Sequence, residues 1–410
     1  MLSPAAPTAP RAPSAWKPRA LAVLFGTVAA LFSFVLAMQN RSFGSRASVD
    51  LDDKNAELAA LLAERDRALA EASELGSLLS WRLALPERIA KTLFPMRHAT
   101  QTYDEYCFYR YKPGVEYANE WPEHPKGRWY VRTNSLGLRE DSDTPKEELD
   151  LRVLVTGDSH TDGVCDNAES FANLVEAALA AQHPGKTIDV GNAGKGGYSF
   201  YSYLGVLERF LALDLAPDVF VVTVYGGNDF EEALTPWHFF AGIQRGNGLP
   251  AYWDSVEAAR KVNEPCLSQG MLATKYFQQN PEEVQRALEA TLGMSGQIIG
   301  ECRARGIVPL FVYLPSWYEL DPDRTMEEFA GVVGALGLAR DDIARVTELG
   351  ERYVAGLRAL GAEVVDQRPA FRAERGALYW QTDHHINLAG HARVAEALLA
   401  PLEALGFGRR

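Results

Sequence analysis

Short apolar runs alternate with amphipathic stretches along the chain from Leu151 onward. The runs with the composition of buried strands are Arg152–Thr156, Thr187–Gly191, Asp218–Tyr225, Ile307–Leu314 and Ala362–Val365. The stretches with helical periodicity are Glu169–Ala181, Tyr201–Leu213, Pro281–Arg305, Asp341–Leu360 and Leu388–Leu405. Strands that are apolar on both faces and separated by helices are typical of a parallel sheet covered on both sides. We therefore predict an α/β fold, a doubly wound (flavodoxin-like) parallel sheet of about five strands, with the ligand site at the carboxyl ends of the strands.

The amino-terminal segment is predicted to anchor the chain in a membrane. Residues 1–18 are rich in Pro and Ala and have no apolar period, which is typical of a disordered tail. Ala20–Met38 then runs without a charge, and as a helix it would be about 28 Å long, close to the hydrocarbon thickness of a bilayer. A transmembrane helix over 19–39 is favoured over a cleaved signal peptide or a buried soluble helix. The flanking basic residues are almost balanced and lean toward a cytoplasmic amino terminus.

Two further segments separate this anchor from the α/β domain. Residues 40–97 are predicted to form a helical spacer, in which the leucines of 51–80 keep a loose heptad rhythm. Both a homodimeric coiled coil and a plain solvated spacer remain open. Residues 98–150 are rich in aromatic residues, Pro and Gly, and are predicted to be an irregular or short-stranded lead-in that ends in a charged linker. The α/β domain then covers 151–410 and carries an insertion at 230–280.

Composition excludes several classes of protein. The 410 residues include 41 basic and 54 acidic side chains, a net charge of −13, which argues against a nucleic-acid partner. The 47% of hydrophobic residues is ordinary for a globular protein. The four cysteines lack Cys-x-x-Cys spacing, so a structural zinc site is not expected, while disulfide pairing stays open.

A serine lies directly after the first predicted strand, in the sequence Gly157-Asp158-Ser159. At a strand-to-helix turn its hydroxyl would be exposed at the edge of the sheet. The plainer alternative is that Asp158 and Ser159 only cap the next helix. Thr161 stands where the nucleophile elbow of α/β-hydrolases has a glycine, so that motif is excluded.

Three more polar motifs follow later in the chain. Residues 192–197 (NAGKGG) and 226–229 (GGND) each follow a predicted strand, and each alone could be a simple turn. Residues 382–387 (TDHHIN) precede the last helix, and an acid so close to an imidazole can hydrogen-bond to it. A metal site is not expected there, because adjacent histidines rarely bind one ion.

Taken together and in this order, the four motifs resemble those of the SGNH (GDSL-type) hydrolase family. The blocks of that family match Ser159, Gly197, Asn228 and His385, with Gly194 as the alternative to Gly197. Residues 134–140 (NSLGLRE) also resemble the lead-in of some members. The resemblance implies that Ser159 is the nucleophile and His385 the base, and that Ser159, Gly197 and Asn228 form the oxyanion hole.

One feature departs from the commonest family pattern. Many members carry the acid three residues before the histidine, whereas Asp383 lies two before His385, as in the branch related to polysaccharide O-acetyltransferases. Asp383 is the expected acid of the triad. Three residues are expected to support the site: Asp158, Asn192 and Asp229. Three are candidates for substrate binding, with a solvated lysine or a satellite core as the alternatives: Lys195, Trp237 and His238.

The resemblance implies a serine esterase that needs no cofactor and no metal. With the anchor and spacer, it suggests hydrolysis of O-acyl, chiefly O-acetyl, esters of an envelope carbohydrate. The expected location is a bacterial inner membrane, with the catalytic domain on the periplasmic side. A lipid esterase or thioesterase, a carbohydrate O-acyltransferase and a catalytically inert binding protein on the same fold are the alternatives.

Overall fold

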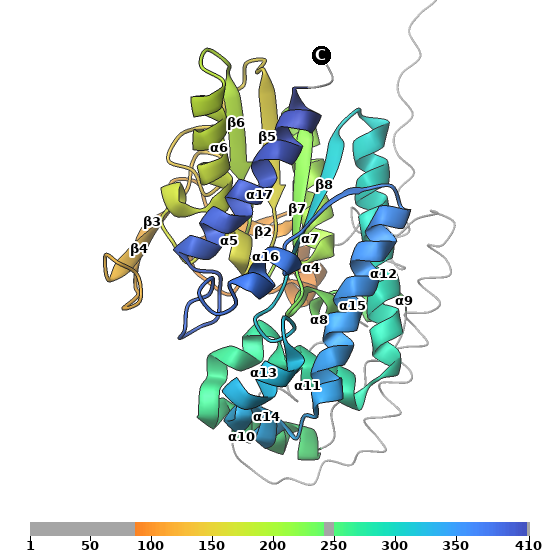
Figure 1. Ribbon diagram of the computed structural model, residues 1–410. Coiled ribbons are helices and arrows are strands. Elements are labelled where there is room, and N and C mark those ends of the chain that lie inside the picture. The colour runs from red at the N-terminus through yellow and green to blue at the C-terminus, as the bar shows by residue number, and fades with distance from the viewer. Residues whose placement is uncertain (1–86, 242–249, 408–410) are drawn as a thin grey trace, which may run out of the picture. The chain divides into compact units, whose positions relative to one another are not determined.

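A computed structural model describes residues 87–241 and 250–407 (Figure 1). The predicted tail, membrane anchor and heptad segment lie outside the described residues. Within the described ranges, no helix is both long and apolar enough to span a membrane. The chain divides into two units, residues 1–93 and 94–410, and the described part of the first is helix α4 (Glu87–Leu93).

Five parallel strands form the central sheet of the second unit, in the order β6-β5-β7-β8-β9. Their bounds are Leu151–Thr156 (β5), Ile188–Asn192 (β6), Val219–Tyr225 (β7), Val308–Leu314 (β8) and Glu363–Asp366 (β9). Every residue of β7 and β8 is buried, because helices cover both faces of the sheet. The predicted five-stranded, doubly wound α/β fold is confirmed, with strand bounds close to those expected.

Amphipathic helices cover the sheet on its two faces. Helices α6 and α17 pack together on the face that is in front in Figure 1, and α7, α12 and α15 pack together on the other. Their bounds are Phe171–Gln182 (α6), Phe200–Ala212 (α7), Glu282–Ala304 (α12), Arg340–Ala359 (α15) and Leu388–Gly406 (α17). Three short elements join strands to helices: α5 (Ser159–Asp162), η2 (Asn167–Glu169) and α16 (Arg368–Ala373).

The insertion forms a helical lobe with its own hydrophobic core. The lobe contains α10 (Pro250–Cys266), the π-helical turn η3 (Leu267–Met271) and α11 (Leu272–Gln279). The two helices before them, α8 (Asp229–Glu232) and α9 (Leu234–Ala241), pack on α12. Helices α13 (Pro322–Glu328) and α14 (Ala330–Leu336) complete the lobe, which lies at the lower end of the sheet in Figure 1. Tyr252, Val256 and Met271 from the insertion pack with Tyr318 and Leu336. Much of the apolar surface of the insertion therefore forms a satellite core.

The lead-in consists of two antiparallel hairpins packed on the α/β domain. The strands are Gln101–Asp104 (β1), Phe108–Tyr111 (β2), Glu116–Glu120 (β3) and Arg128–Arg132 (β4). The charged linker, residues 140–148, is exposed or half-buried except for Glu140, which is buried, as is Arg139 just before it. The Glu140 carboxylate accepts the backbone N–H of Asn192 at 2.7 Å, and burial raises the pKa of Glu140 to about 8.

All four cysteines are buried and unpaired. The disulfides that the sequence left open are therefore not formed.

Candidate active site

Ser159 begins α5 at the carboxyl end of β5, where the chain leaves the sheet. The Asp158 carboxylate caps this turn by accepting the backbone N–H of His160 at 2.9 Å. A Cβ on Gly157 would lie 2.0 Å from the Thr161 hydroxyl oxygen, so this tight turn needs a glycine. The turn keeps Ser159 partly exposed while its neighbours Asp158 and His160 are buried.

His385 joins Ser159 to Asp383 in a hydrogen-bonded relay. The Ser159 Oγ and His385 Nε2 atoms are 2.8 Å apart, and His385 Nδ1 lies 2.8 Å from Asp383 Oδ2. Burial alone would lower the pKa of His385, but the Asp383 carboxylate, together with Asp158 and Asp162, outweighs burial and raises that pKa. With the proton of His385 on Nδ1 and donated to Asp383, the lone pair on Nε2 is free to accept the serine proton.

The Asp-x-His spacing is accommodated by a turn at the residue between the two. His384 has a φ of +61°, a left-handed conformation that is uncommon for a side-chain-bearing residue. The Asp383 carboxylate also accepts the backbone N–H of His385 at 3.1 Å, which fixes the turn. The His384 ring is directed into the lobe, with its Nε2 3.3 Å from Cys266 Sγ. Its pKa falls to about 4 because of burial.

The glycine-rich loop after β6 lies beside the nucleophile. A Cβ on Gly196 would be 3.6 Å from Ser159 Cβ, and the Gly196 N–H donates to Asp162 Oδ2 at 3.1 Å. Gly197 has a φ of +83°, so the left-handed turn there favours glycine. Gly194, the alternative position, instead packs on α5, because its Cβ would lie 2.6 Å from the Asp162 amide nitrogen.

Asn228 follows β7 at the same carboxyl edge of the sheet, where it begins α8. Its Nδ2 donates to Glu232 Oε1 at 3.2 Å. Burial, with repulsion from Glu231, raises the pKa of Glu232 to about 8, so the carboxyl group is mainly neutral at pH 7. A neutral acceptor beside Asn228 orients the amide without placing a full negative charge near it.

The residues expected to support the site hold its loops in place. The Asn192 amide donates to the Thr161 carbonyl oxygen at 3.0 Å and its side-chain oxygen accepts the Gly194 N–H at 3.0 Å. The Asp229 carboxylate accepts the Tyr203 hydroxyl at 2.8 Å and the backbone N–H of Tyr225 at 2.9 Å. Together with the cap by Asp158, these bonds fix the turns that carry Ser159, Gly197 and Asn228.

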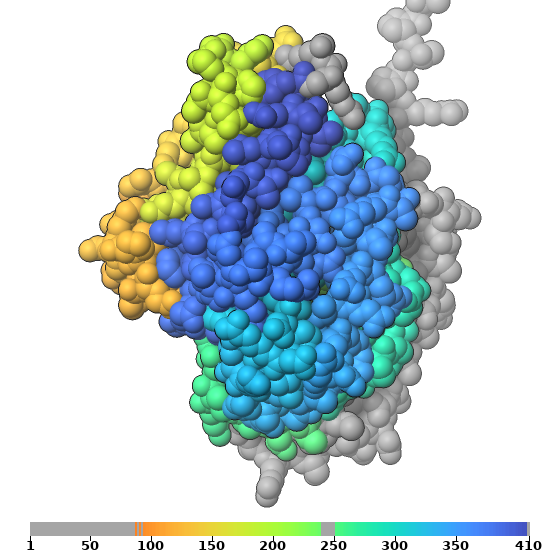
Figure 2. All heavy atoms as spheres, in the orientation of Figure 1, coloured from red at the N-terminus to blue at the C-terminus, as the bar shows by residue number. Residues whose placement is uncertain are grey.

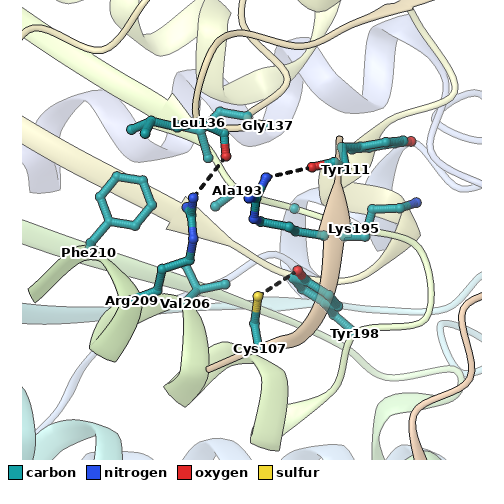
Figure 3. Close-up of a pocket in the computed structure, with 13 residues that line it drawn as sticks. Cys107, Tyr111, Leu136, Gly137, Ala193, Lys195, Tyr198, Val206, Arg209 and Phe210 are labelled. Carbon is teal, nitrogen blue, oxygen red and sulfur yellow. Dashed lines mark hydrogen bonds between the residues drawn. The ribbon is translucent and has the colours of Figure 1, made fainter. Parts of the chain in front are cut away.

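Lys195, a candidate for substrate binding with a solvated side chain as the alternative, is buried in an ion pair. Its ammonium group lies 3.0 Å from Asp162 Oδ2 and 4.1 Å from the centre of the Tyr111 ring. Lys195 lines a cavity of about 20 Å³ between the lead-in and the glycine-rich loop, room for one water molecule (Figure 3). The ion pair belongs to the packing of the lead-in, which the sequence alone could not place.

The two candidates in the insertion, Trp237 and His238, lie next to each other on α9. His238 is buried on α9, with its Nε2 2.8 Å from Glu283 Oε2 on α12. Trp237 is partly buried on the same helix. The contact of His238 with Glu283 belongs to the packing of α9 on α12.

Two residues that contact the relay or its loop carry no motif that could have revealed them. Gln269, from η3, places its Nε2 3.3 Å from His385 Nε2. The Glu123 carboxylate accepts the backbone N–H groups of Gln381 and Thr382, each at 2.7 Å, just before Asp383. The β3–β4 hairpin that carries Glu123 adjoins the carboxyl-terminal loop in Figure 2. Both contacts depend on how distant segments pack.

The fold and the site together have the organisation of a serine-dependent ester hydrolase. A serine, a histidine and an aspartate form one relay at the carboxyl edge of a five-stranded α/β sheet. The profile of the GDSL-like Lipase/Acylhydrolase family matches residues 155–393, more than half of the chain. The protein belongs to this family and is an ester hydrolase.

Solved structures with a similar arrangement include esterases, all at low identity. One is an alpha/beta hydrolase enzyme from the metagenome of Lake Arreo, Spain, at 17% identity and a TM-score of 0.36, with 63% of this chain and 97% of that chain covered. Another is an acetyl xylan esterase from Geobacillus stearothermophilus, at 16% identity and a TM-score of 0.35, with 63% and 94% covered. A search of curated proteins found no match.

Proposed function

We propose that the protein hydrolyses O-acyl esters, chiefly O-acetyl esters of an envelope carbohydrate, through an acyl-enzyme on Ser159. The observation that carries the mechanism is the relay, in which both hydrogen bonds of His385, to Ser159 and to Asp383, are 2.8 Å long. A serine hydroxyl is a weak nucleophile until an adjacent base removes its proton, and these contacts supply that base and its orienting acid.

In the acylation half-reaction, His385 Nε2 takes the proton of Ser159 while Oγ bonds to the carbonyl carbon. The carbonyl electron pair moves onto its oxygen, which accepts hydrogen bonds from the backbone N–H groups of Ser159 and Gly197 and from the Asn228 amide. Each such donor contributes about 10²–10³-fold to the rate. The bond to the alcohol then breaks, and the alcohol oxygen receives the proton from His385.

In deacylation, water attacks the acyl-enzyme and gives its proton to His385. The bond between the acyl carbon and Ser159 Oγ breaks, the carboxylic acid leaves, and the proton returns to the serine. No metal or cofactor takes part in these steps.

The polar surroundings of the nucleophile support a small acyl group. The side chain that hydrogen-bonds to the relay from outside it is the Gln269 amide, whereas large apolar side chains gather in the core around the sheet and in the satellite core of the insertion. A long acyl chain would need an apolar groove to bind. The predicted anchor over 19–39 and the spacer after it favour an envelope substrate, with the domain on the periplasmic side of a bacterial inner membrane.

The test is hydrolysis of 4-nitrophenyl esters of increasing acyl length by the full chain and by Ser159→Ala. Acetyl turnover should exceed that of acyl chains longer than about four carbons, and Ser159→Ala should lose about 10⁴-fold or more. Ser135→Ala, which alters an exposed serine, is the control and should leave the rate unchanged. A preference for long chains would favour the lipid esterase, and wild-type turnover equal to that of Ser159→Ala would contradict the serine mechanism.

A further inference from the structure

A π-helical turn of the insertion rests directly on the carboxyl edge of the sheet. In η3, the backbone oxygen of Gln269 accepts the Tyr225 hydroxyl at 2.9 Å. A Cβ on Gly227 would lie 2.5 Å from this same oxygen, so the two segments pack backbone to backbone. Gln269 is only 5% exposed. Its side chain is therefore held at the site by the fold of the insertion.

The hydrogen bonds of His160 fix which end of the Gln269 amide faces the relay. The backbone N–H of Ile386 donates to His160 Nδ1 at 3.2 Å, so that nitrogen carries the lone pair. Burial and the nearby His385 hold the pKa of His160 well below its usual range, so the ring is neutral and its proton lies on Nε2. This proton is donated to Gln269 Oε1 at 3.0 Å. The NH₂ group of Gln269 must then face His385.

This NH₂ group lies where the alcohol oxygen of a substrate has to bind. His385 Nε2 accepts from Ser159 Oγ at 2.8 Å and from Gln269 Nε2 at 3.3 Å. After the serine proton has moved to His385, the imidazolium N–H can no longer accept from Gln269, and both groups are donors. An ester or alcohol oxygen placed between them relieves this conflict, because its two lone pairs can accept from both.

We propose that Gln269 is a specificity-determining residue that binds the alcohol oxygen of the ester beside His385 Nε2. This inference rests on the proposed function and names the alcohol side of the same site. In acylation, the carbon–oxygen bond to the alcohol breaks and the proton on His385 Nε2 moves to that oxygen, while Gln269 donates a hydrogen bond throughout and changes no covalent bond. The same contact serves an incoming water or sugar hydroxyl in deacylation. The residue thus favours basic, aliphatic alcohols such as sugars, whose oxygen needs help to leave.

The experiment compares two acetyl esters that differ only in the alcohol, using the full chain. 4-Nitrophenol leaves without assistance, whereas a sugar hydroxyl, probed with an O-acetylated methyl xyloside, requires a proton and a donor. Gln269→Leu should lower kcat/KM for the acetylated xyloside by about 10-fold or more and for 4-nitrophenyl acetate by less than about 3-fold. Gln279→Leu, on the exposed side of α11, is the matched control and should change neither rate.

The acid limb of the pH–rate profile is a second measurement, and it would stay unchanged on substitution if Gln269 had only a structural role. A donor to the neutral imidazole opposes its protonation, so Gln269→Leu should move the limb to higher pH. Gln269→Glu, which keeps the size of the side chain, should move it further, because its carboxylate accepts from protonated His385. The other groups that act on His385 are Asp383 and His384 on its own loop, Asp158, His160 and Asp162 at the β5–α5 turn, and His391 on α17, and all variants share them.

The outcomes separate this inference from the proposed function. Equal losses for the two esters in Gln269→Leu, with an unshifted acid limb in both variants, would overturn the role of Gln269 while leaving the serine esterase intact. Unchanged rates on both esters would overturn it too. If the wild-type chain and Ser159→Ala hydrolyse both esters equally slowly, the proposed function itself fails. A selective loss on the xyloside with a shifted limb supports the inference.

Discussion

Arg139→Met should destabilise the α/β domain by several kcal/mol, although Arg139 lies in the lead-in and outside the sheet. Arg139 is completely buried, and all three guanidinium nitrogens donate hydrogen bonds. The acceptors are Asn167 Oδ1 at 2.8 Å, Asp162 O at 2.6 Å, Asp162 Oδ1 at 3.0 Å, Gly163 O at 3.2 Å and Cys165 O at 2.7 Å. The guanidinium therefore satisfies the buried hydrogen-bond acceptors of the segment that follows α5, all in one network.

The expected cost follows from what a methionine would leave behind. Removing one partner of a buried ion pair costs about 3–5 kcal/mol. The lower end applies, because Asp162 keeps Lys195 at 3.0 Å and the Tyr111 hydroxyl at 3.0 Å. The orphaned carbonyl oxygens each add about 1–3 kcal/mol where water does not reach them. With about 1 kcal/mol for each of the three carbonyl oxygens, those of Asp162, Gly163 and Cys165, the sum is about 6 kcal/mol, a large part of the stability of an ordinary domain, about 5–15 kcal/mol.

Urea unfolding of the full chain, followed by tryptophan fluorescence, measures this loss. Arg139→Lys should retain about half of the lost stability, because an ammonium group can reach Asp162 but cannot serve all the acceptors. Arg340→Met, which removes an arginine paired with Asp323 in solvent, is the matched control and should change little. A loss below about 1.5 kcal/mol for Arg139→Met would refute the view that the guanidinium network supports the domain.

Three further predictions concern the site. Ionised Glu232 would place a negative charge beside the Asn228 amide, so kcat should fall as pH rises through about 8. Glu232→Gln should remove this fall, and an alkaline limb unchanged in that variant would contradict the assignment of the limb to Glu232. Glu123→Ala should lower kcat by about 10-fold, because it frees the loop before Asp383. A rise in KM with kcat unchanged would contradict this role of Glu123. The raised pKa of His385 depends on the Asp383 carboxylate, so Asp383→Asn should move the acid limb of kcat/KM to lower pH and reduce kcat by about 10³–10⁴-fold. A kcat within about 10-fold of wild type would exclude Asp383 as the acid of the triad.

The sequence by itself determined the α/β architecture and the approximate position of the site. The apolar runs of β7 and β8 could only be strands covered on both faces, and the helical stretches between the strands imposed parallel crossovers. In such a sheet the carboxyl ends of the strands meet at one edge, so the motifs around Ser159 and Asn228 had to converge there. These features are local patterns, which is why they can be predicted without coordinates.

The tertiary structure decided which side chains meet. Glu123 reaches the loop before Asp383 across 258 residues of chain, and Gln269 reaches His385 across 116. Lys195, which the sequence left as either a candidate for substrate binding or a solvated side chain, is buried and paired with Asp162, because the lead-in closes over that side of the loop. Hydrogen bonds act over about 3 Å and buried charges need partners, so such roles depend on packing between segments that no local pattern relates.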